Sequence, residues 1–225
     1  MKRIGLLIAV EMDAILNSDY QLLEKCQVGK FEVYKYQINN QEIIAIHSGI
    51  GQVYAAAASE ILISLFKVDV IINFGVAGSL SDDLGLASIC LVKGLVDYQY
   101  DVSKIDNVEP ARHENYPDVV IETNKELRDL VLSLHPSLPQ VNCASGHVFV
   151  EDKKEKERLF KEYHCSIVEM EAIGIQLIAD MHDVPVLYIK GISDNVLGGA
   201  AQYSDFKNKV AKLCLEIVDS LFNKL

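Results

Sequence analysis

The sequence predicts an α/β fold in which helices cover both sides of a mostly parallel β-sheet. Short runs rich in Val and Ile alternate along the chain with longer amphipathic stretches, as strands and helices do in this class. Several of the short runs are apolar almost without interruption, which is typical of strands buried on both faces. No shift in composition divides the 225 residues, so we expect a single domain spanning residues 1–225.

The strands are expected where the apolar runs lie. Buried strands are predicted at residues 3–10, 42–47, 70–74, 88–96 and 186–192. Residues 31–38 alternate between polar and apolar, and Asn39-Asn40 supplies turn residues before the strand at 42–47. These two segments should therefore form an antiparallel hairpin.

The helices are expected in the amphipathic stretches between the strands, at residues 53–65, 125–134, 153–163, 172–181 and 205–221. In the last of these, apolar residues repeat at the spacing of one helix face, namely Val210, Leu213, Cys214, Ile217, Val218 and Leu221. Residues 97–118 contain two prolines and three tyrosines and show no regular pattern. A loop of that length in a compact domain is more often functional than idle.

Charge and composition exclude several classes of protein. The chain has 21 Lys and Arg against 32 Asp and Glu, a formal net charge of −11, whereas nucleic-acid binding usually needs a basic face. The apolar run near the N-terminus stops at Glu11, which favours a first strand over a signal peptide, and no other apolar run is long enough to cross a bilayer. The five cysteines are scattered without a Cys-x-x-Cys pair, so we expect reduced thiols in a cytoplasmic protein and no metal site.

Two glycine-containing segments follow expected strands. Ser48-Gly49-Ile50-Gly51 opens a helix like the dinucleotide-binding fingerprint, but Tyr54 replaces the third glycine, so a bound NAD is not expected. Gly75-Val76-Ala77-Gly78 is either a tight strand-to-helix turn or a backbone wall that lets a flat ligand approach closely. No Gly-x-x-x-x-Gly-Lys-Ser/Thr segment is present, which excludes a P-loop.

Three acidic residues, Asp13, Glu171 and Asp194, stand directly after apolar runs. Each acid alone is also explained by a helix N-terminus or a turn. Ligands of open α/β sheets bind outside the carboxyl ends of the strands, so the three side chains should converge on one crevice. Carboxylates there suit cleavage of a glycosidic bond, because the transition state gains positive charge on the sugar and a buried carboxyl can protonate the leaving group.

Six segments together carry a resemblance to a known family. They are Ile4-Gly5 with Ala9-Val10-Glu11-Met12-Asp13, Ser48-Gly49-Ile50-Gly51, residues 72–78, Ser145-Gly146-His147-Val148-Phe149-Val150, Val168-Glu169-Met170-Glu171-Ala172 and Ile192-Ser193-Asp194. In order and spacing they resemble the purine nucleoside phosphorylase/uridine phosphorylase superfamily, and within it the 5′-methylthioadenosine/S-adenosylhomocysteine nucleosidases. The last two segments in tandem are highly specific, whereas the glycine segments alone are weak.

The resemblance implies a three-layer α/β/α fold around a mixed, partly barrel-like sheet, and a homodimer. It also implies hydrolysis of the bond between adenine and ribose in 5′-methylthioadenosine and S-adenosylhomocysteine, with water as the nucleophile and no cofactor. Protonating the purine makes it a better leaving group, and nearby negative charge stabilises the sugar cation that forms.

Roles for individual residues also come from the resemblance. Asp194 would protonate or hydrogen-bond adenine N7, Glu171 would bind the ribose 2′-hydroxyl, and Asp13 would orient and deprotonate the attacking water. The substrate contacts that it implies are stacking on the base by Phe149, the backbone of Val150 at the base edge, Met170 below the sugar, and Ile50, Val76, Gly78, Glu169 and Ser193.

Three departures from the family pattern bear on activity and substrate. Asp13 stands where Glu is usual and is one methylene shorter, so the backbone shifts inward, Glu11 or Glu169 assists, or activity is poor. Val76 stands where a small hydroxyl residue is usual. Residues 103–109 are mostly polar where the nucleosidases hold an apolar 5′ group, so adenosine or another nucleoside stays an alternative substrate.

Two other functions stay open alongside the nucleosidase. A phosphorylase would hold phosphate through arginines, but none of the four (Arg3, Arg112, Arg128 and Arg158) matches the family positions, which favours water as the acceptor. A nucleoside-binding relative that has lost its chemistry is supported by Asp13 and Val76 and opposed by Glu171 and Asp194.

Overall fold

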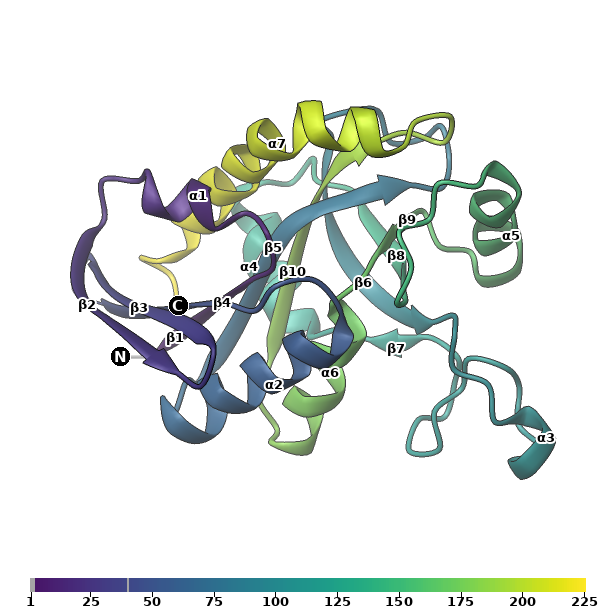
Figure 1. Cartoon of the computed structure of the whole chain (residues 1–225), viewed down its shortest axis with the longest axis horizontal. Helices are drawn as coiled ribbons and strands as arrows, with labels where there is room; N and C mark the ends of the chain where they lie inside the picture. Colours follow the sequence, from purple (N-terminus) through teal and green to yellow (C-terminus); the bar gives the residue numbers. More distant parts are fainter. Residues whose placement is uncertain (1–2, 40) are drawn as a thin grey trace.

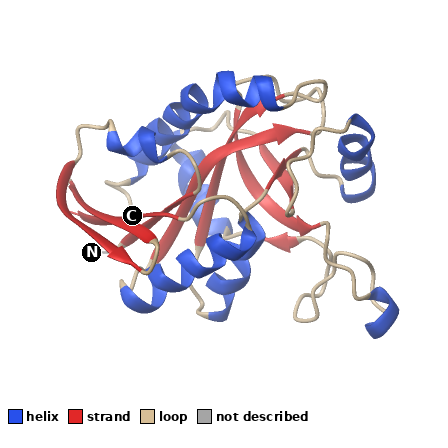
Figure 2. Cartoon of the chain, viewed as in Figure 1, coloured by secondary structure: helices blue, strands red, loops and turns tan. Residues whose placement is uncertain are grey.

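The computed structural model describes residues 3–39 and 41–225, and its centre is a mixed β-sheet with helices on both faces (Figures 1 and 2). The strands are β1 (Ile4–Ile8), β2 (Gln21–Val28), β3 (Phe31–Ile38), β4 (Gln41–His47), β5 (Val70–Ser79), β6 (Ile89–Asp97), β7 (Ile121–Glu122), β8 (Gln140–Ser145), β9 (Ile167–Glu169) and β10 (Val186–Asp194). The helices are α1 (Met12–Leu16), α2 (Gln52–Glu60) with its π-helical continuation η1 (Ile61–Leu65), α3 (Ser103–Asp106), α4 (Lys125–Leu134), α5 (Lys153–Tyr163), α6 (Ala172–Met181) and α7 (Ala200–Leu221).

The sheet is open at one side and closed at the other. Its strand order is β10-β6-β8-β9-β5-β1-β4-β3-β2, with β7 beside β6. Strand β10 also pairs with β5, so β5, β10, β6, β8 and β9 form a barrel-like ring. The pairs β1–β4, β1–β5, β5–β10, β6–β8 and β8–β9 are parallel, and the remaining pairings are antiparallel.

Two apolar layers separate the sheet from the helices, which confirms the expected α/β/α architecture. Helices α1, α4 and α7 pack on one face, where Ile72 of β5 and Val218 of α7 belong to one apolar cluster. Helices α2 and α6 pack on the other face, where Ile71 lies in the same cluster as Ile173. Successive strand residues point to opposite faces, so a strand buried on both sides has to be apolar throughout.

Several elements differ from the expectation. Strands β2, β7, β8 and β9 were not predicted. Within the described residues β2 is an edge strand paired with β3 alone, and most of its side chains are exposed. Residues 75–78 continue β5 rather than forming a turn, since β10 pairs alongside as far as Gly78. Helix α7 begins at Ala200, earlier than the apolar stripe indicates. Asn40, half of the expected hairpin turn, lies outside the described residues.

The parallel strands β1, β5 and β10 bring their carboxyl ends to the same edge of the sheet. The chain leaves this edge through residues 9–11 after β1 and through the segment between β10 and α7. Among the helices that the structure describes, none is both long and apolar enough to cross a membrane. The edge at these strand ends is where ligands of such sheets bind.

Candidate active site

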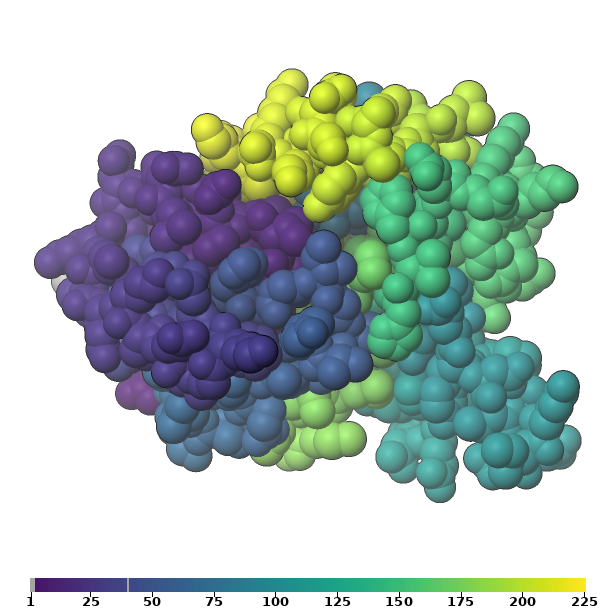
Figure 3. Space-filling view, in the orientation of Figure 1, coloured from purple at the N-terminus to yellow at the C-terminus, as the bar shows by residue number. Residues whose placement is uncertain are grey.

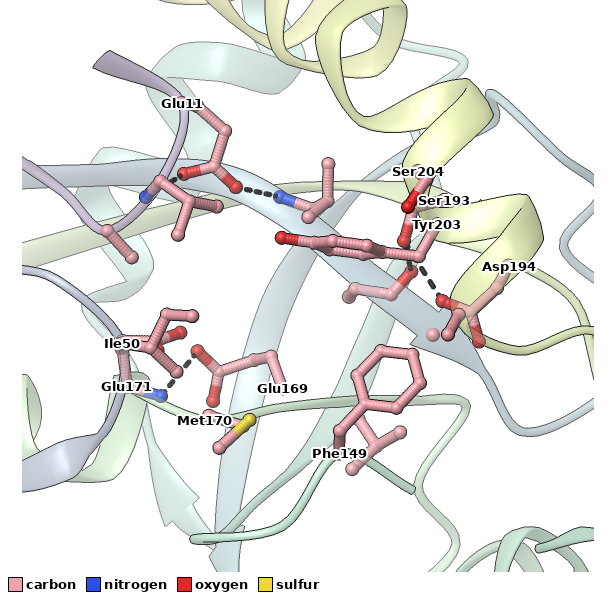
Figure 4. Close-up of a pocket in the computed structure, with 17 residues that line it drawn as sticks. Glu11, Ile50, Phe149, Glu169, Met170, Glu171, Ser193, Asp194, Tyr203 and Ser204 are labelled. Carbon is pink, nitrogen blue, oxygen red and sulfur yellow. Dashed lines mark hydrogen bonds between the residues drawn. The ribbon is translucent and has the colours of Figure 1, made fainter. Parts of the chain in front are cut away.

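A cavity of about 470 Å³ lies at the carboxyl ends of β1, β5 and β10 (Figure 4). In the space-filling view the surface is hollowed where the N-terminal half, the segment around residue 150 and α7 meet (Figure 3). The cavity is mostly apolar, with acidic groups placed around it. Its lining residues are Ala9, Val10, Glu11, Ile50, Val76, Ala77, Gly78, Phe149, Val168, Glu169, Met170, Glu171, Ser193, Asp194, Ala200, Tyr203 and Ser204.

Glu11 supplies the acid that follows β1. Its buried carboxylate accepts hydrogen bonds from the backbone N–H of Val76 (2.9 Å) and of Val10 (3.0 Å). Gly75 makes this approach possible, because a Cβ at that position would lie 2.6 Å from Oε1 of Glu11. The carboxylate is therefore fixed at the cavity wall by two backbone donors.

The expected placement of Asp13 is wrong in this structure. Asp13 lies in the first turn of α1, is exposed, and borders a recess of about 150 Å³ on the far side of Glu11, which lines both that recess and the main cavity. Because α1 begins at Met12, Asp13 projects from the helix in a different direction from Glu11, its N-cap residue. The first-strand acid at the cavity is Glu11, which the sequence suggested only as an assisting residue.

Asp194 ends β10 at the opposite side of the cavity and is 1% exposed. Its Oδ1 accepts a hydrogen bond from the Ser193 hydroxyl (3.0 Å), and its Oδ2 accepts one from Lys156 Nζ (2.9 Å). Gly78 of the neighbouring β5 leaves room for it, since a Cβ there would lie 3.0 Å from Oδ2. Glu11 and Asp194 thus each pack against a glycine of β5, Glu11 against Gly75 and Asp194 against Gly78.

Glu171 faces the cavity from the start of α6. Its Oε1 accepts a hydrogen bond from the Gly51 N–H at 2.7 Å, and Gly51 has a φ of 105°, which favours glycine. Burial of the side chain, followed by the charge of nearby Glu169, raises the pKa of Glu171 to about 7.

Glu169 lines the cavity, but its carboxylate accepts hydrogen bonds from other groups of the protein. It accepts hydrogen bonds from the backbone N–H groups of Glu171 (3.0 Å) and Ala172 (2.9 Å) and from buried Lys190 Nζ (3.1 Å). These contacts fix the start of α6 and so the position of Glu171, which leaves Glu169 as a wall of the site with little capacity to bind a ligand.

Aromatic and thioether groups supply the apolar walls (Figure 4). The rings of Phe149 and Tyr203 meet edge to face with centroids 5.7 Å apart. Tyr203 comes from the first turns of α7, and burial followed by the charge of Glu11 raises its pKa. Met170 and Ile50 lie on the side of the cavity nearer Glu171, and Ile50 is 53% exposed at its mouth.

The structure brings most of the predicted site residues to this one cavity. Those that line it are Ile50, Val76, Gly78, Phe149, Glu169, Met170, Glu171, Ser193 and Asp194. Val150 borders a small adjoining recess of about 30 Å³ together with Phe149 and Asp194. Tyr203 and Ser204 were missed because the helix was expected only from residue 205. Lys156 was missed although it is on the buried stripe of α5 with Leu159.

The polar segment expected near the 5′ end of a substrate lies elsewhere. No residue of 99–117 is among those lining the cavity, so the polar segment 103–109 does not shape it within the described chain. In Figure 1 the segment, marked by α3, projects away from the helices that cover the sheet. Among the residues that the structure describes, no arginine lines the cavity. Arg128 donates to Thr123 and Gln140, and Arg158 donates to Glu155 and Glu162.

The raised pKa of Glu171 predicts a loss of stability as pH rises. Between its ordinary value of 4.5 and about 7, the folded state binds the proton that the unfolded state has lost. The contribution of Glu171 is therefore fully present below pH 4.5 and falls through pH 7, by about 3 kcal/mol in all. Urea unfolding of the wild type and Glu171→Gln at several pH values measures it; a difference between them that stays constant with pH would contradict the prediction.

The sequence and the structure match known nucleosidases over their full length. The profile of the Phosphorylase superfamily matches residues 3–223. An aminodeoxyfutalosine nucleosidase of Helicobacter pylori is 30% identical, and the match covers 100% of both chains. A 5′-methylthioadenosine/S-adenosylhomocysteine nucleosidase of Staphylococcus aureus is 27% identical, and the match covers 99% of this chain and 100% of that protein. The crystal structure of the H. pylori 5′-methylthioadenosine/S-adenosylhomocysteine nucleosidase with butyl-thio-DADMe-Immucillin-A aligns with a TM-score of 0.94 at 29% identity, covering 100% of this chain and 99% of that one.

Proposed function

Because the chain belongs to the phosphorylase superfamily and is an N-ribosyl hydrolase within it, we propose that it cleaves the bond between adenine and ribose in 5′-substituted adenine nucleosides. The observation that carries this proposal is that Glu11, Glu171 and Asp194 face one cavity from three different directions. Three carboxylates around a mostly apolar cavity suit a reaction in which a sugar becomes cationic while its base departs.

The base is assigned to the side of the cavity that holds Asp194. There the ring of Phe149 offers a stacking surface, and the recess beside Val150 borders the same carboxyl group. Asp194 bearing a proton passes it to N7 of the purine, the C1′–N9 electron pair moves onto the base, and adenine departs neutral. General acid catalysis of this kind contributes about 10²–10⁴-fold in rate.

The ribose is assigned to the space between Glu171 and Glu11. An ionised Glu171 accepts a hydrogen bond from a ribose hydroxyl, and Met170 packs against the sugar. Glu11 orients water and takes its proton as the oxygen attacks C1′, so the added hydroxyl replaces the base. With its two oxygens held by backbone N–H groups, Glu11 has a fixed position from which to do this.

The substituent on the 5′ carbon is assigned to the mouth of the cavity beside Ile50. An apolar thioether there loses contact with water, which favours 5′-methylthioadenosine and S-adenosylhomocysteine over adenosine. Aminodeoxyfutalosine is the second candidate, because the relative at 30% identity is a nucleosidase for that compound by name. All of these candidates share the same bond cleavage and differ only beyond the 5′ carbon.

The test is release of free base from 5′-methylthioadenosine, S-adenosylhomocysteine, aminodeoxyfutalosine, adenosine and inosine, each with and without phosphate. We expect release from at least one 5′-substituted nucleoside at a higher kcat/KM than from adenosine. The rate should not depend on phosphate, because no Lys or Arg lines the cavity in the described chain. A requirement for phosphate would make the protein a phosphorylase, and binding of nucleosides without base release would make it a binding protein.

We further infer that the chain acts as a homodimer through the outer face of α2 and α6. Val53 and Tyr54 of α2 and Met181 at the end of α6 are large apolar side chains that are 72%, 59% and 75% exposed. Such side chains on neighbouring helices favour burial against a second copy. Sedimentation equilibrium of the purified protein gives the mass that decides between monomer and dimer.

The compartment that we assign is the cytoplasm. All five cysteines are free, and Cys90, Cys143, Cys165 and Cys214 are buried. Burial raises the pKa of the Cys90 and Cys165 thiols to about 12, so these groups stay protonated and unreactive. Unpaired buried thiols are typical of proteins that fold in a reducing environment.

A further inference from the structure

A buried ammonium group stands directly behind the acid of the proposed site. Lys156 is fully buried, although the rest of α5 is rich in exposed charged residues. Its Nζ lies 2.9 Å from Oδ2 of Asp194, which is itself 1% exposed. Lys156 does not line the cavity, so it meets the substrate only through Asp194.

The other hydrogen bonds of Lys156 go to the segment that follows Asp194. Nζ donates to the backbone carbonyls of Asn195 (2.8 Å) and Gly198 (3.3 Å). An ammonium group has three N–H donors, so Lys156 uses all of them on Asp194 and on the two carbonyls. The same segment leads into α7, which brings Tyr203 and Ser204 to the cavity wall.

We propose that Lys156 is a positioning residue for the general acid: its ammonium group fixes Asp194 and stabilises the carboxylate that forms when Asp194 gives its proton to the base. This inference rests on the proposed function. In the step concerned, the O–H bond of Asp194 breaks, the N7–H bond of the purine forms, and Lys156 keeps all its protons. A negative charge that appears in a buried place is stabilised strongly by a cation at 2.9 Å, because little water is present to screen the two.

A purely structural role for Lys156 is the competing explanation. Removing one partner of a buried ion pair destabilises a fold whatever the chemistry, because the other charge is left uncompensated. The two explanations differ in how they couple to Asp194. If Lys156 acts through Asp194, a substitution of Lys156 has little further effect on kcat in a variant that already lacks the acid. The effects of substituting Lys156 and Asp194 are then not additive.

The experiment is a double-mutant cycle of Lys156→Met and Asp194→Asn, measured as kcat and KM for whichever nucleoside the wild type hydrolyses best. We expect Lys156→Met alone to lower kcat by roughly 10²-fold with a smaller change in KM. In the Asp194→Asn background the same change should cost less than about threefold, since the acid is already absent. Equal losses in both backgrounds, or full kcat in Lys156→Met, would overturn the inference.

Further variants separate charge from packing. Lys153→Met removes an exposed lysine from the same helix and should leave kcat unchanged. Lys156→Arg keeps the charge, whereas Lys156→Gln keeps only a hydrogen-bond donor and replaces the Met variant if that one does not fold. We expect the Arg variant to retain at least tenfold more turnover than the Gln variant, and equal turnover of the two would overturn the inference.

The wild-type protein in the same assay keeps this inference apart from the proposed function. If the wild type releases no base from any nucleoside, the proposed function fails. If the wild type is active and the Lys156 variants do not behave as described, only the role of Lys156 fails.

Discussion

Replacing Asp194 with asparagine is expected to lower kcat for base release by about 10²–10⁴-fold while the chain stays folded. The amide has the same shape as the carboxyl group, and its oxygen still accepts the hydrogen bond from Lys156, so the local packing is kept. The amide cannot pass a proton to N7, and the base then has to depart as an anion. KM should change much less than kcat, because the lost interaction develops mainly in the transition state.

Steady-state kinetics with the nucleoside that the wild type hydrolyses best measures this loss, and circular dichroism with thermal unfolding checks the fold. Ser193→Ala is the matched control, since it removes the neighbouring hydroxyl that donates to Oδ1 but leaves the acid in place. We expect the control to lose far less activity than Asp194→Asn. Turnover by Asp194→Asn within a few-fold of the wild type would remove Asp194 from the mechanism.

Replacing Glu11 with glutamine should also lower kcat, by about 10²-fold or more. Glu11 holds two backbone N–H groups with its two carboxylate oxygens, and a glutamine can satisfy only one of them as an acceptor. The variant also lacks the carboxylate to which the proposed mechanism gives the proton of the attacking water. The loss should appear with every nucleoside that the protein accepts, because the water is common to all of them.

Asp13→Asn is the matched comparison for Glu11→Gln. Asp13 is exposed and lies outside the main cavity, so its variant should keep kcat and KM within about twofold of the wild type. Comparing kcat of the two variants decides whether Glu11 or Asp13 takes part in the reaction. A large loss in Asp13→Asn together with full activity in Glu11→Gln would return the role to Asp13.

Sequence patterns were sufficient to predict that helices cover both faces of a central sheet. The apolar runs of β1, β5 and β10 located the buried strands because a strand covered on both faces has few positions for polar residues. The bounds of α4, α5 and α6 were predicted to the residue, since each helix has one face toward the sheet and a clear start. Four strands escaped prediction. The exposed side chains of β2 carry no such pattern, β7 and β9 are only two and three residues long, and polar residues interrupt the apolar run of β8.

The lining of the cavity was predicted in part. Glu171 and Asp194 were identified from their places after apolar runs, and both face the cavity. The sequence placed Asp13 at the cavity, whereas Glu11 lines it, because the placement depends on where α1 begins and on two N–H groups, one of which belongs to β5. Gly75 and Gly78 were predicted as part of a turn, whereas they are strand residues that leave room for Glu11 and Asp194.

The sequence by itself determined the class of fold, the strands β1, β5 and β10 that end at the cavity and two of the three acids that face it, because these follow from patterns among residues close together in the chain. Only the tertiary structure decided that Glu11 rather than Asp13 faces the cavity, that Tyr203 lines it and that Lys156 pairs with Asp194. Lys156 and Asp194 are 38 positions apart in the sequence. Contacts of this kind form where packing brings distant elements together, and no local pattern of residues specifies them.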